Sequence, residues 1–221
     1  MISILPESHR RLGRHVEHDP ASLAYPAAVA PQIITTVHIR HCPPYDQGNL
    51  GSCTGNAMAG LLMTGPFWQP SRTLTEADAV NLYEKATHLD GVPGVYPPDD
   101  TGSSGLAVAK AAKAHGWIAG YRHAFGLNHA LGALTVAPVI IGINWYDSFD
   151  TPDKNGLIRI TPGAQVRGGH EVCLRAVSVE NRQMRGTNSW GASWGLGGEF
   201  LLGWDDLARL LAEHGDVTTA H

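Results

Sequence analysis

Four residues of this chain have the side chains that a cysteine nucleophile needs, and they occur in three short motifs. Gln47 and Cys53 lie in DQGNLGSC, His170 lies in GGHEV, and Asn188 lies in TNSWG. A thiolate attacks carbonyl carbons, an imidazole moves the proton, and a third polar side chain fixes the imidazole tautomer. The motifs therefore indicate covalent catalysis by a thiol.

The sequence around Cys53 favours a lowered thiol pKa. Residues 48–52 predict a loop, and the small apolar residues that follow predict a buried helix from Cys53 to about Met63. Free N–H groups at a helix N-terminus and a neighbouring imidazolium both stabilise a thiolate. We therefore expect Cys53 to be the nucleophile and His170 to be its acid–base partner.

The remaining polar groups have the chemistry of supporting roles. We expect Asn188 to hydrogen-bond the other ring nitrogen of His170, and Trp190 to shield that bond from water. A tetrahedral intermediate needs donors already aimed at its oxyanion, and the Cys53 backbone N–H and the Gln47 side-chain amide are the candidates. Losing one such donor costs about 3–4 kcal/mol of transition-state stabilisation.

These motifs resemble those of the papain-like (C1-type) cysteine peptidases, over roughly residues 43–204. The resemblance implies an α+β, papain-like two-lobe fold. A helical lobe would contain the helix of the catalytic cysteine, a β-rich, barrel-like lobe would contain the histidine and asparagine, and the active site would lie in the cleft between them. It also implies an endopeptidase with a Cys53–His170–Asn188 triad, a thioester acyl-enzyme, and an oxyanion hole that includes Gln47. No cofactor or metal is implied.

Three features depart from the family pattern. Leu50 stands where the family usually has a half-cystine, and Thr54 replaces the aromatic residue after the nucleophile. His170 also follows Cys53 at a shorter distance than the usual about 130–150 residues, which indicates trimmed loops. Together these features resemble the disulfide-free bacterial and phage branch.

The resemblance also suggests which residues contact substrate. Gly102 and Ser103 belong to a glycine-containing loop that would bind the peptide backbone, and Gly102 permits close approach. Gly169 and Trp190 are further substrate-binding candidates. Glu171 would line the pocket for the side chain two residues before the scissile bond, which favours Lys or Arg there because a partly buried carboxylate needs a cation.

Composition is that of a compact domain without nucleic-acid or membrane features. The chain has 221 residues, 43% of them hydrophobic, and a net charge of −4 with both signs dispersed. We expect a peptide or protein substrate, no nucleic-acid partner and no membrane partner; the oligomeric state is not predicted. No secretory leader or span of about 20 apolar residues is found, so we expect cytoplasmic synthesis, with a virion location open for a phage protein.

The three cysteines, Cys42, Cys53 and Cys173, cannot all pair with one another. If Cys53 is the nucleophile, only a Cys42–Cys173 disulfide is left, and we do not expect it because low cysteine use fits a reducing compartment or a bacterial origin. Cys173 alternates with apolar residues in an expected strand, which predicts a core position.

The chain divides into an arm and one domain. Residues 1–31 form an irregular N-terminal arm, open as a propeptide remnant, that we expect to pack on the surface. Residues 32–221 form the peptidase domain, with a helical lobe at about 46–125 and a β-rich lobe at about 126–221 plus 32–45. Helices are expected at 53–63, 76–88, 105–115, 127–134 and 204–213, and strands at 33–39, 138–145, 157–161, 170–179, 183–188 and 198–202.

Two other functions are compatible with parts of this pattern. A non-catalytic papain-like module of a larger assembly would not need all four catalytic groups, so their presence argues against it. A cell-wall amidase-type cysteine hydrolase on a related fold is the second. The glutamine before the cysteine and the asparagine after the histidine favour the peptidase.

Overall fold

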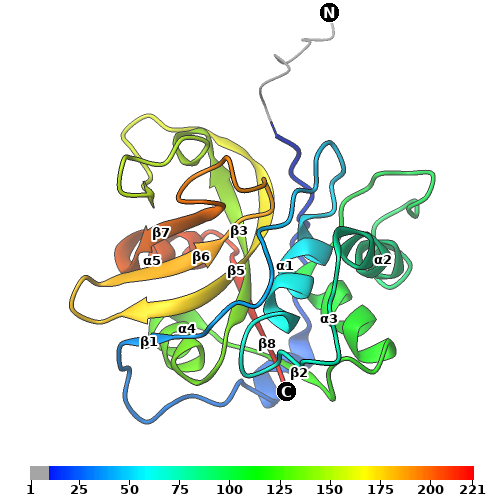
Figure 1. The fold of residues 1–221 in the computed structure, drawn as a ribbon, viewed down its shortest axis with the longest axis horizontal. Coiled ribbons are helices and arrows are strands. Elements are labelled where there is room, and N and C mark those ends of the chain that lie inside the picture. Colours follow the sequence, from blue (N-terminus) through cyan, green and yellow to red (C-terminus); the bar gives the residue numbers. More distant parts are fainter. Residues whose placement is uncertain (1–9) are drawn as a thin grey trace, which may run out of the picture.

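Two hydrophobic cores divide residues 10–221, which the computed structural model describes, into two lobes. One core lies among helices α1 to α3 and the other lies beneath a curved sheet. Figure 1 shows the three helices on one side and the sheet on the other. The helical lobe contains α1 (Cys53–Leu62), α2 (Glu76–Thr87) and α3 (Gly105–Ala114). Among the described residues, no helix is both long and apolar enough to cross a membrane.

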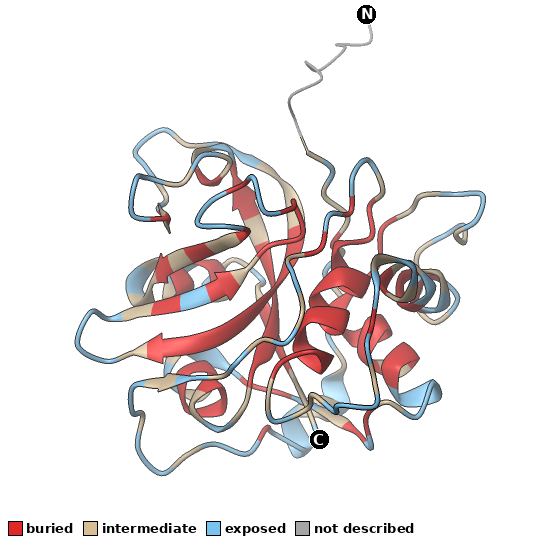
Figure 2. Ribbon diagram, in the orientation of Figure 1, coloured by how far each residue is buried: buried red, intermediate tan, exposed pale blue. Residues whose placement is uncertain are grey.

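Helix α1 is buried along its whole length, as its small apolar residues predict. All ten of its residues are buried, and Figure 2 shows it as a continuous red coil between the lobes. Gly55 permits α2 to approach, because a Cβ at this position would collide with the Ala79 carbonyl oxygen. The opposite side of α1 lies against β5 (Val166–Ser178).

Helices α2 and α3 each begin at a capping residue. In α2 the Thr75 N–H donates to the Asp78 carboxylate at 2.7 Å, in a capping box. In α3 the Ser104 hydroxyl accepts the Ala107 N–H at 3.0 Å. The observed ends of α1, α2 and α3 lie within one residue of the prediction.

The second lobe is built on an eight-stranded sheet in the order β2-β8-β3-β5-β6-β7-β4, with β1 paired to β5. Among the strands of residues 10–221, β4 and β7 form the one parallel pair. Helix α4 (Gly126–Val136) and helix α5 (Trp204–Ala212) pack on this lobe, and single 3-10 turns occur at Pro20–Ala24 and Asp147–Phe149. The other strands are β1 (Thr36–Val37), β2 (Tyr121–His123), β3 (Val139–Tyr146), β4 (Leu157–Ile158), β6 (Gln183–Thr187), β7 (Glu199–Gly203) and β8 (Asp216–Ala220).

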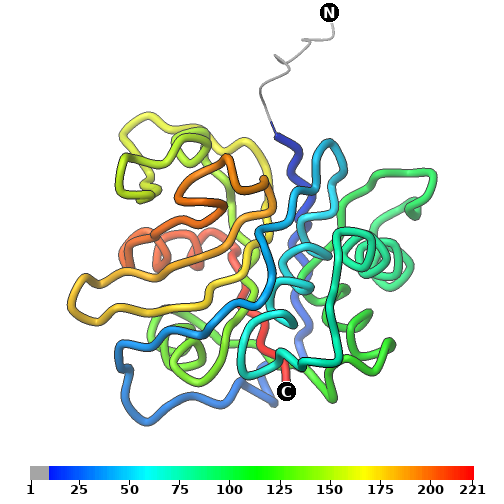
Figure 3. Tube along the Cα trace, in the orientation of Figure 1, coloured from blue at the N-terminus to red at the C-terminus, as the bar shows by residue number. Residues whose placement is uncertain are grey.

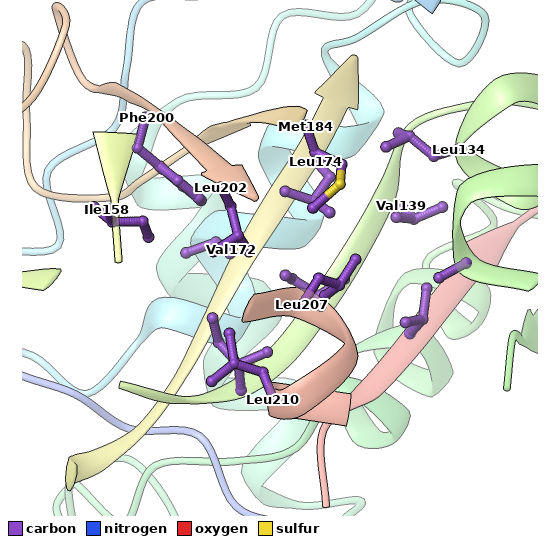
Figure 4. Packing of buried hydrophobic residues seen from close by; sticks show 14 of the residues in the cluster. Leu134, Val139, Ile158, Val172, Leu174, Met184, Phe200, Leu202, Leu207 and Leu210 are labelled. Atoms are coloured by element: carbon purple, nitrogen blue, oxygen red, sulfur yellow. The ribbon is translucent and has the colours of Figure 1, made fainter. Parts of the chain in front are cut away.

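The core of this lobe forms where the long strands meet the helices. Figure 4 shows Val172 and Leu174 of β5 beside Val139 of β3, with Leu207 and Leu210 of α5 close by. The chain trace in Figure 3 shows β5, in yellow, leading from beside α1 into the sheet lobe. The central strand therefore belongs to both lobes: Cys173, at its middle, lies in the helical core, as the alternation of apolar residues predicts.

Several sequence expectations need correction. The strand expected at 33–39 is only Thr36–Val37, since this segment lies at the sheet edge with Ile34 and Ile39 exposed. The strand expected at 157–161 ends at Ile158. Strands β2 and β8 were not expected, and β2 joins the sheet from the range assigned to the helical lobe. The arm packs on the outer surface only in part: its first described residues, 10–15, enter between the lobes, whereas Leu23 and Tyr25 further along are exposed.

Two glycines of α1 test the packing of the helical lobe. Gly55→Ala forces a methyl group into the Ala79 backbone, so we expect it to lower the free energy of unfolding by about 1–3 kcal/mol. Gly60→Ala is the matched control, because its methyl would meet only Cys173 Cβ at 3.9 Å; higher helix propensity should then raise stability by up to about 1 kcal/mol. Chemical denaturation measures both. Equal effects would contradict the assigned contact.

Candidate active site

Cys53 is the first residue of α1, at the boundary between the lobes, and its side chain is fully buried. Burial raises the pKa of the Cys53 thiol to about 12. Backbone N–H groups of Glu171, Gly13 and Thr54 hydrogen-bond the sulfur and oppose this increase, whereas the Glu171 carboxylate adds to it. The thiol is therefore protonated at neutral pH in this arrangement.

His170, on β5, is held by one ring nitrogen and free at the other. Its Nε2 lies 2.8 Å from Asn188 Oδ1, and the same oxygen accepts the Ser189 N–H at 2.7 Å. Since that atom is an acceptor twice, Nε2 carries the ring proton. Nδ1 is then an acceptor, and it is buried without a hydrogen-bond partner among residues 10–221. Burial lowers the His170 pKa to about 4, opposed by the Asn188 hydrogen bond.

Aromatic rings enclose the His170–Asn188 pair. The Trp190 ring lies 5.2 Å from the His170 ring, and the Trp145 ring meets the imidazole edge-to-face at 4.8 Å. Trp190 is buried against Trp145 and Trp194, beside the imidazole that it was expected to shield from water. These aromatic contacts of Trp190 are with core residues. Trp145, on β3, is a contributor that the motifs did not identify.

Gln47 lies in the loop before α1, with its amide orientation fixed at both ends. Its Oε1 accepts the Ser189 hydroxyl at 2.5 Å, and its Nε2 donates to the Leu50 carbonyl at 2.7 Å. Nε2 also lies 3.3 Å from the carbonyl oxygen of Arg11. The amide N–H groups therefore already face a carbonyl of a chain lying in the cleft.

Asp100 holds the loop before the cysteine, a role that the sequence did not reveal. Its carboxylate accepts the Gly51 N–H at 3.0 Å and the Tyr83 hydroxyl at 2.7 Å, and it pairs with Arg11 at 2.9 Å. Asp100 begins the loop that contains Gly102 and Ser103, and the sequence predicts a role only for these two residues. Asp100 thus links the nucleophile loop to α2 and to the expected substrate loop.

The N-terminal arm crosses the site as an extended chain. Ser103 hydrogen-bonds the residues on both sides of Arg14. The Ser103 N–H donates to the Gly13 carbonyl at 2.8 Å, and the His15 N–H donates to the Ser103 carbonyl at 2.7 Å. On the other side, the Arg14 N–H donates to the Gly169 carbonyl at 2.9 Å. Figure 1 shows this dark-blue segment passing between the sheet and the helices. The arm therefore forms three backbone hydrogen bonds with two of the residues expected to contact substrate, Ser103 and Gly169.

Glycines allow this backbone approach. A Cβ at Gly13 would collide with the Gly51 carbonyl, one at Gly102 with the Gly13 carbonyl, and one at Gly169 with the Arg14 carbonyl. Gly102 also has a φ of 76°, which L side chains rarely adopt. The glycines at these three contacts thus let the arm backbone and the cleft walls approach closely.

The Arg14 side chain enters a buried pocket beside His170. It forms an ion pair with Asp216 of β8, and its Nη2 donates to the His214 carbonyl at 2.8 Å. Glu171 lies in the same pocket, fully buried; burial, followed by the Asp216 charge, raises its pKa, whereas Arg14 lowers it. Glu171 was expected in such a pocket, but Asp216 was not, because nothing in its local sequence links it to the other motifs.

The structure brings the predicted residues of the cleft together from both lobes. Gln47, Cys53, Gly102 and Ser103 come from the helical side, and the sheet side supplies a second group: Gly169, His170, Glu171, Asn188 and Trp190. The three cysteines are free thiols. What the sequence did not indicate is the arm that occupies this cleft.

Comparison with known proteins gives a consistent assignment of the fold. No protein-family model matches the chain. An uncharacterized peptidase C1-like protein of Acanthamoeba polyphaga mimivirus is 33% identical over 71% of this chain; the chain spans 63% of that relative, less than two thirds of its length.

Solved structures match over nearly the whole chain. Xylellain, a cysteine protease from Xylella fastidiosa, has a TM-score of 0.70 at 18% identity, covering 96% of this chain and 97% of its own. A digestive procathepsin L proteinase of Tenebrio molitor has a TM-score of 0.66 at 16% identity, covering 98% of this chain and 80% of its own. The bromelain protease of Ananas comosus has a TM-score of 0.55 at 12% identity, covering 84% and 98%. The chain therefore has the fold of the papain-like cysteine proteases, as the motifs imply.

Proposed function

We propose that this protein is a cysteine-type peptidase in which Cys53 is the nucleophile, His170 the acid–base residue, and Asn188 the residue that orients the imidazole. The observation that supports this most directly is the state of His170. One ring nitrogen is fixed by Asn188, and the other is a buried acceptor without a partner, on the strand residue next to the Glu171 N–H that bonds the Cys53 sulfur. A core histidine would normally have both nitrogens satisfied.

The proposed reaction follows from these groups. The thiol proton moves to His170 Nδ1, and the thiolate attacks the carbonyl carbon of the scissile bond. The Cys53 N–H and the Gln47 amide stabilise the resulting oxyanion. The imidazolium then protonates the leaving amine, and a thioester is formed. Water, deprotonated by His170, hydrolyses the thioester, releasing the acid and restoring the thiol.

The arm holds this machinery in an inactive state. The Gly13 N–H of the arm hydrogen-bonds the Cys53 sulfur. The arm backbone also takes the hydrogen-bonding groups of Ser103 and Gly169. Burial in this arrangement raises the pKa of the thiol and lowers that of the imidazole, which opposes formation of the reactive ion pair. Peptide hydrolysis therefore requires that residues 10–15 leave the cleft.

The proposed roles are tested by incubating the Gly13→Ala chain, in which a methyl group against the Gly51 carbonyl displaces the arm, with an E-64-type epoxide and with fluorogenic peptidyl amides. We expect covalent labelling at Cys53 together with turnover, both lost in Cys53→Ala. Labelling without turnover would indicate a different hydrolase, such as a cell-wall amidase. No labelling, even after the arm is displaced, would contradict the peptidase and indicate a non-catalytic module.

The oxyanion role of Gln47 has its own test. Gln47→Ala removes an aligned donor, so kcat should fall by about 100- to 1,000-fold while KM changes little. Gln165→Ala is the matched control, because Gln165 is an exposed amide whose Nε2 bonds only the nearby Gly163 carbonyl among the described residues. Steady-state kinetics on the same peptidyl amide decide the matter. A similar loss in both variants would remove Gln47 from the mechanism.

Displacement of the arm should expose the thiol. Gly13→Ala places a methyl group against the Gly51 carbonyl and should force the arm out. We expect iodoacetamide to alkylate Cys53 at pH 7 at least about tenfold faster than in the unaltered chain, because both access and thiolate fraction increase. Peptide mass spectrometry separates Cys53 from Cys42 and Cys173.

Gly91→Ala is the control for this substitution. Gly91 is exposed, and an added Cβ would meet nothing within 4 Å. The rate of Cys53 alkylation in this variant should therefore stay at the value of the unaltered chain. If Gly13→Ala and Gly91→Ala react equally slowly, the arm does not control the thiol.

A further inference from the structure

A buried pocket with two acidic side chains opens beside the nucleophile, and Arg14 fills it. Its walls come from four elements: Glu171 of β5, Asp216 of β8, Gly142 of β3 and Gly105 of α3. The Arg14 side chain is 1% exposed and that of Asp216 is 7% exposed. Charges buried to this degree are stable only when they are paired, so the pocket requires a cation.

The two glycines give the pocket its size. A Cβ at Gly142 would collide with the Arg14 Nε and with the carboxylates of Asp216 and Glu171, so all three groups surround one point on the wall. A Cβ at Gly105 would lie 2.8 Å from Glu171 Oε1 and 2.9 Å from Asp216 Oδ1. The pocket therefore fits a long side chain with a planar, branched head between two carboxyl groups.

The arm leaves part of this hydrogen-bonding capacity unused. Arg14 Nη2 bonds Asp216 and the His214 carbonyl. Among residues 10–221, Arg14 Nε and both carboxyl oxygens of Glu171 have no partner. A guanidinium has five donors in a fixed fork and can bond two carboxylates and a carbonyl together, whereas an ammonium has three donors at one point. The acceptors of the pocket thus match the donors of arginine better than those of lysine.

The pocket is also placed to receive a side chain of a bound peptide. Ser103 and Gly169 bond the backbone on either side of Arg14, and Glu171 follows the catalytic histidine directly. Any extended peptide that uses the same backbone groups would direct one side chain between Glu171 and Asp216.

We propose that Glu171 and Asp216 select an arginine side chain two residues before the scissile bond of the peptide substrate, and that Arg14 of the arm is the intramolecular competitor for this pocket. The substrate role rests on the proposed peptidase function. Selection of a guanidinium by the pocket does not rest on the peptidase function, because this selection concerns binding alone. Substrate arginine enters only after Arg14 has left.

Binding and turnover are measured on the full chain with Gly13→Ala and Arg14→Ala, which empties the pocket. The probes are dipeptidyl fluorogenic amides with Arg, Lys, Leu or Gln at the position two residues before the cleaved bond and a constant second residue. For binding, Cys53→Ala is added, and the corresponding capped dipeptide amides are titrated by calorimetry. We expect arginine to exceed leucine and glutamine by about 10- to 100-fold in both kcat/KM and affinity, with lysine between them.

Variants assign the preference to the pocket. Asp216→Asn should reduce the ratio of arginine to leucine by about tenfold or more, and Glu171→Gln should reduce it as well. Asp205→Asn is the control, because that carboxylate on α5 is 92% exposed and should leave the ratio unchanged. The comparison of arginine with leucine needs no pocket variant, so it remains decisive even where a variant fails to fold.

The outcomes separate the two proposals. Leucine bound or cleaved as well as arginine would overturn the pocket assignment while leaving the peptidase intact. Arginine bound selectively by the Cys53→Ala chain, without epoxide labelling or turnover in the chain that retains Cys53, would support the pocket and overturn the peptidase.

Discussion

The packing of α1 against β5 is the contact on which the site depends. Cys53 begins the helix and His170 lies on the strand, so neither lobe contains a complete site. Cys173 shows how far the two elements share a core, because it lies on the sheet and yet belongs to the helical core. A shift between the lobes would separate the thiol from the Glu171 N–H that hydrogen-bonds its sulfur.

The same close geometry explains how the arm and a substrate would compete. The cleft offers backbone groups of Ser103 and Gly169, lined by glycines where a bound chain comes closest. The arm satisfies these groups, adds the ion pair of Arg14 with Asp216, and hydrogen-bonds the Cys53 sulfur through the Gly13 N–H. In the proposed mechanism, a substrate would need the same backbone groups that the arm occupies.

Local sequence predicted the elements whose signals are local. The helix that begins at Cys53 has a continuous run of small apolar residues, and the capping box of Thr75 and Asp78 marks the start of α2. The motifs around Gln47, His170 and Asn188 predicted residues that the fold brings together. By contrast, Arg14 and Asp216 are 202 positions apart, and only the tertiary structure pairs them. Strands β2 and β8 were missed for a similar reason, because each is short and is defined by its pairing partner.

The pKa of Cys53 once the arm has been displaced tests the central claim most directly. It is measured from the pH dependence of iodoacetamide alkylation of Cys53 in Gly13→Ala, with and without His170→Ala. If thiol and imidazole form an ion pair in the open cleft, the alkylation pKa lies well below the ordinary thiol value of about 8.5 and rises when His170 is removed. A pKa at or above about 8.5 in both proteins would mean that the imidazole does not ionise the thiol, and the proposed catalysis would be wrong.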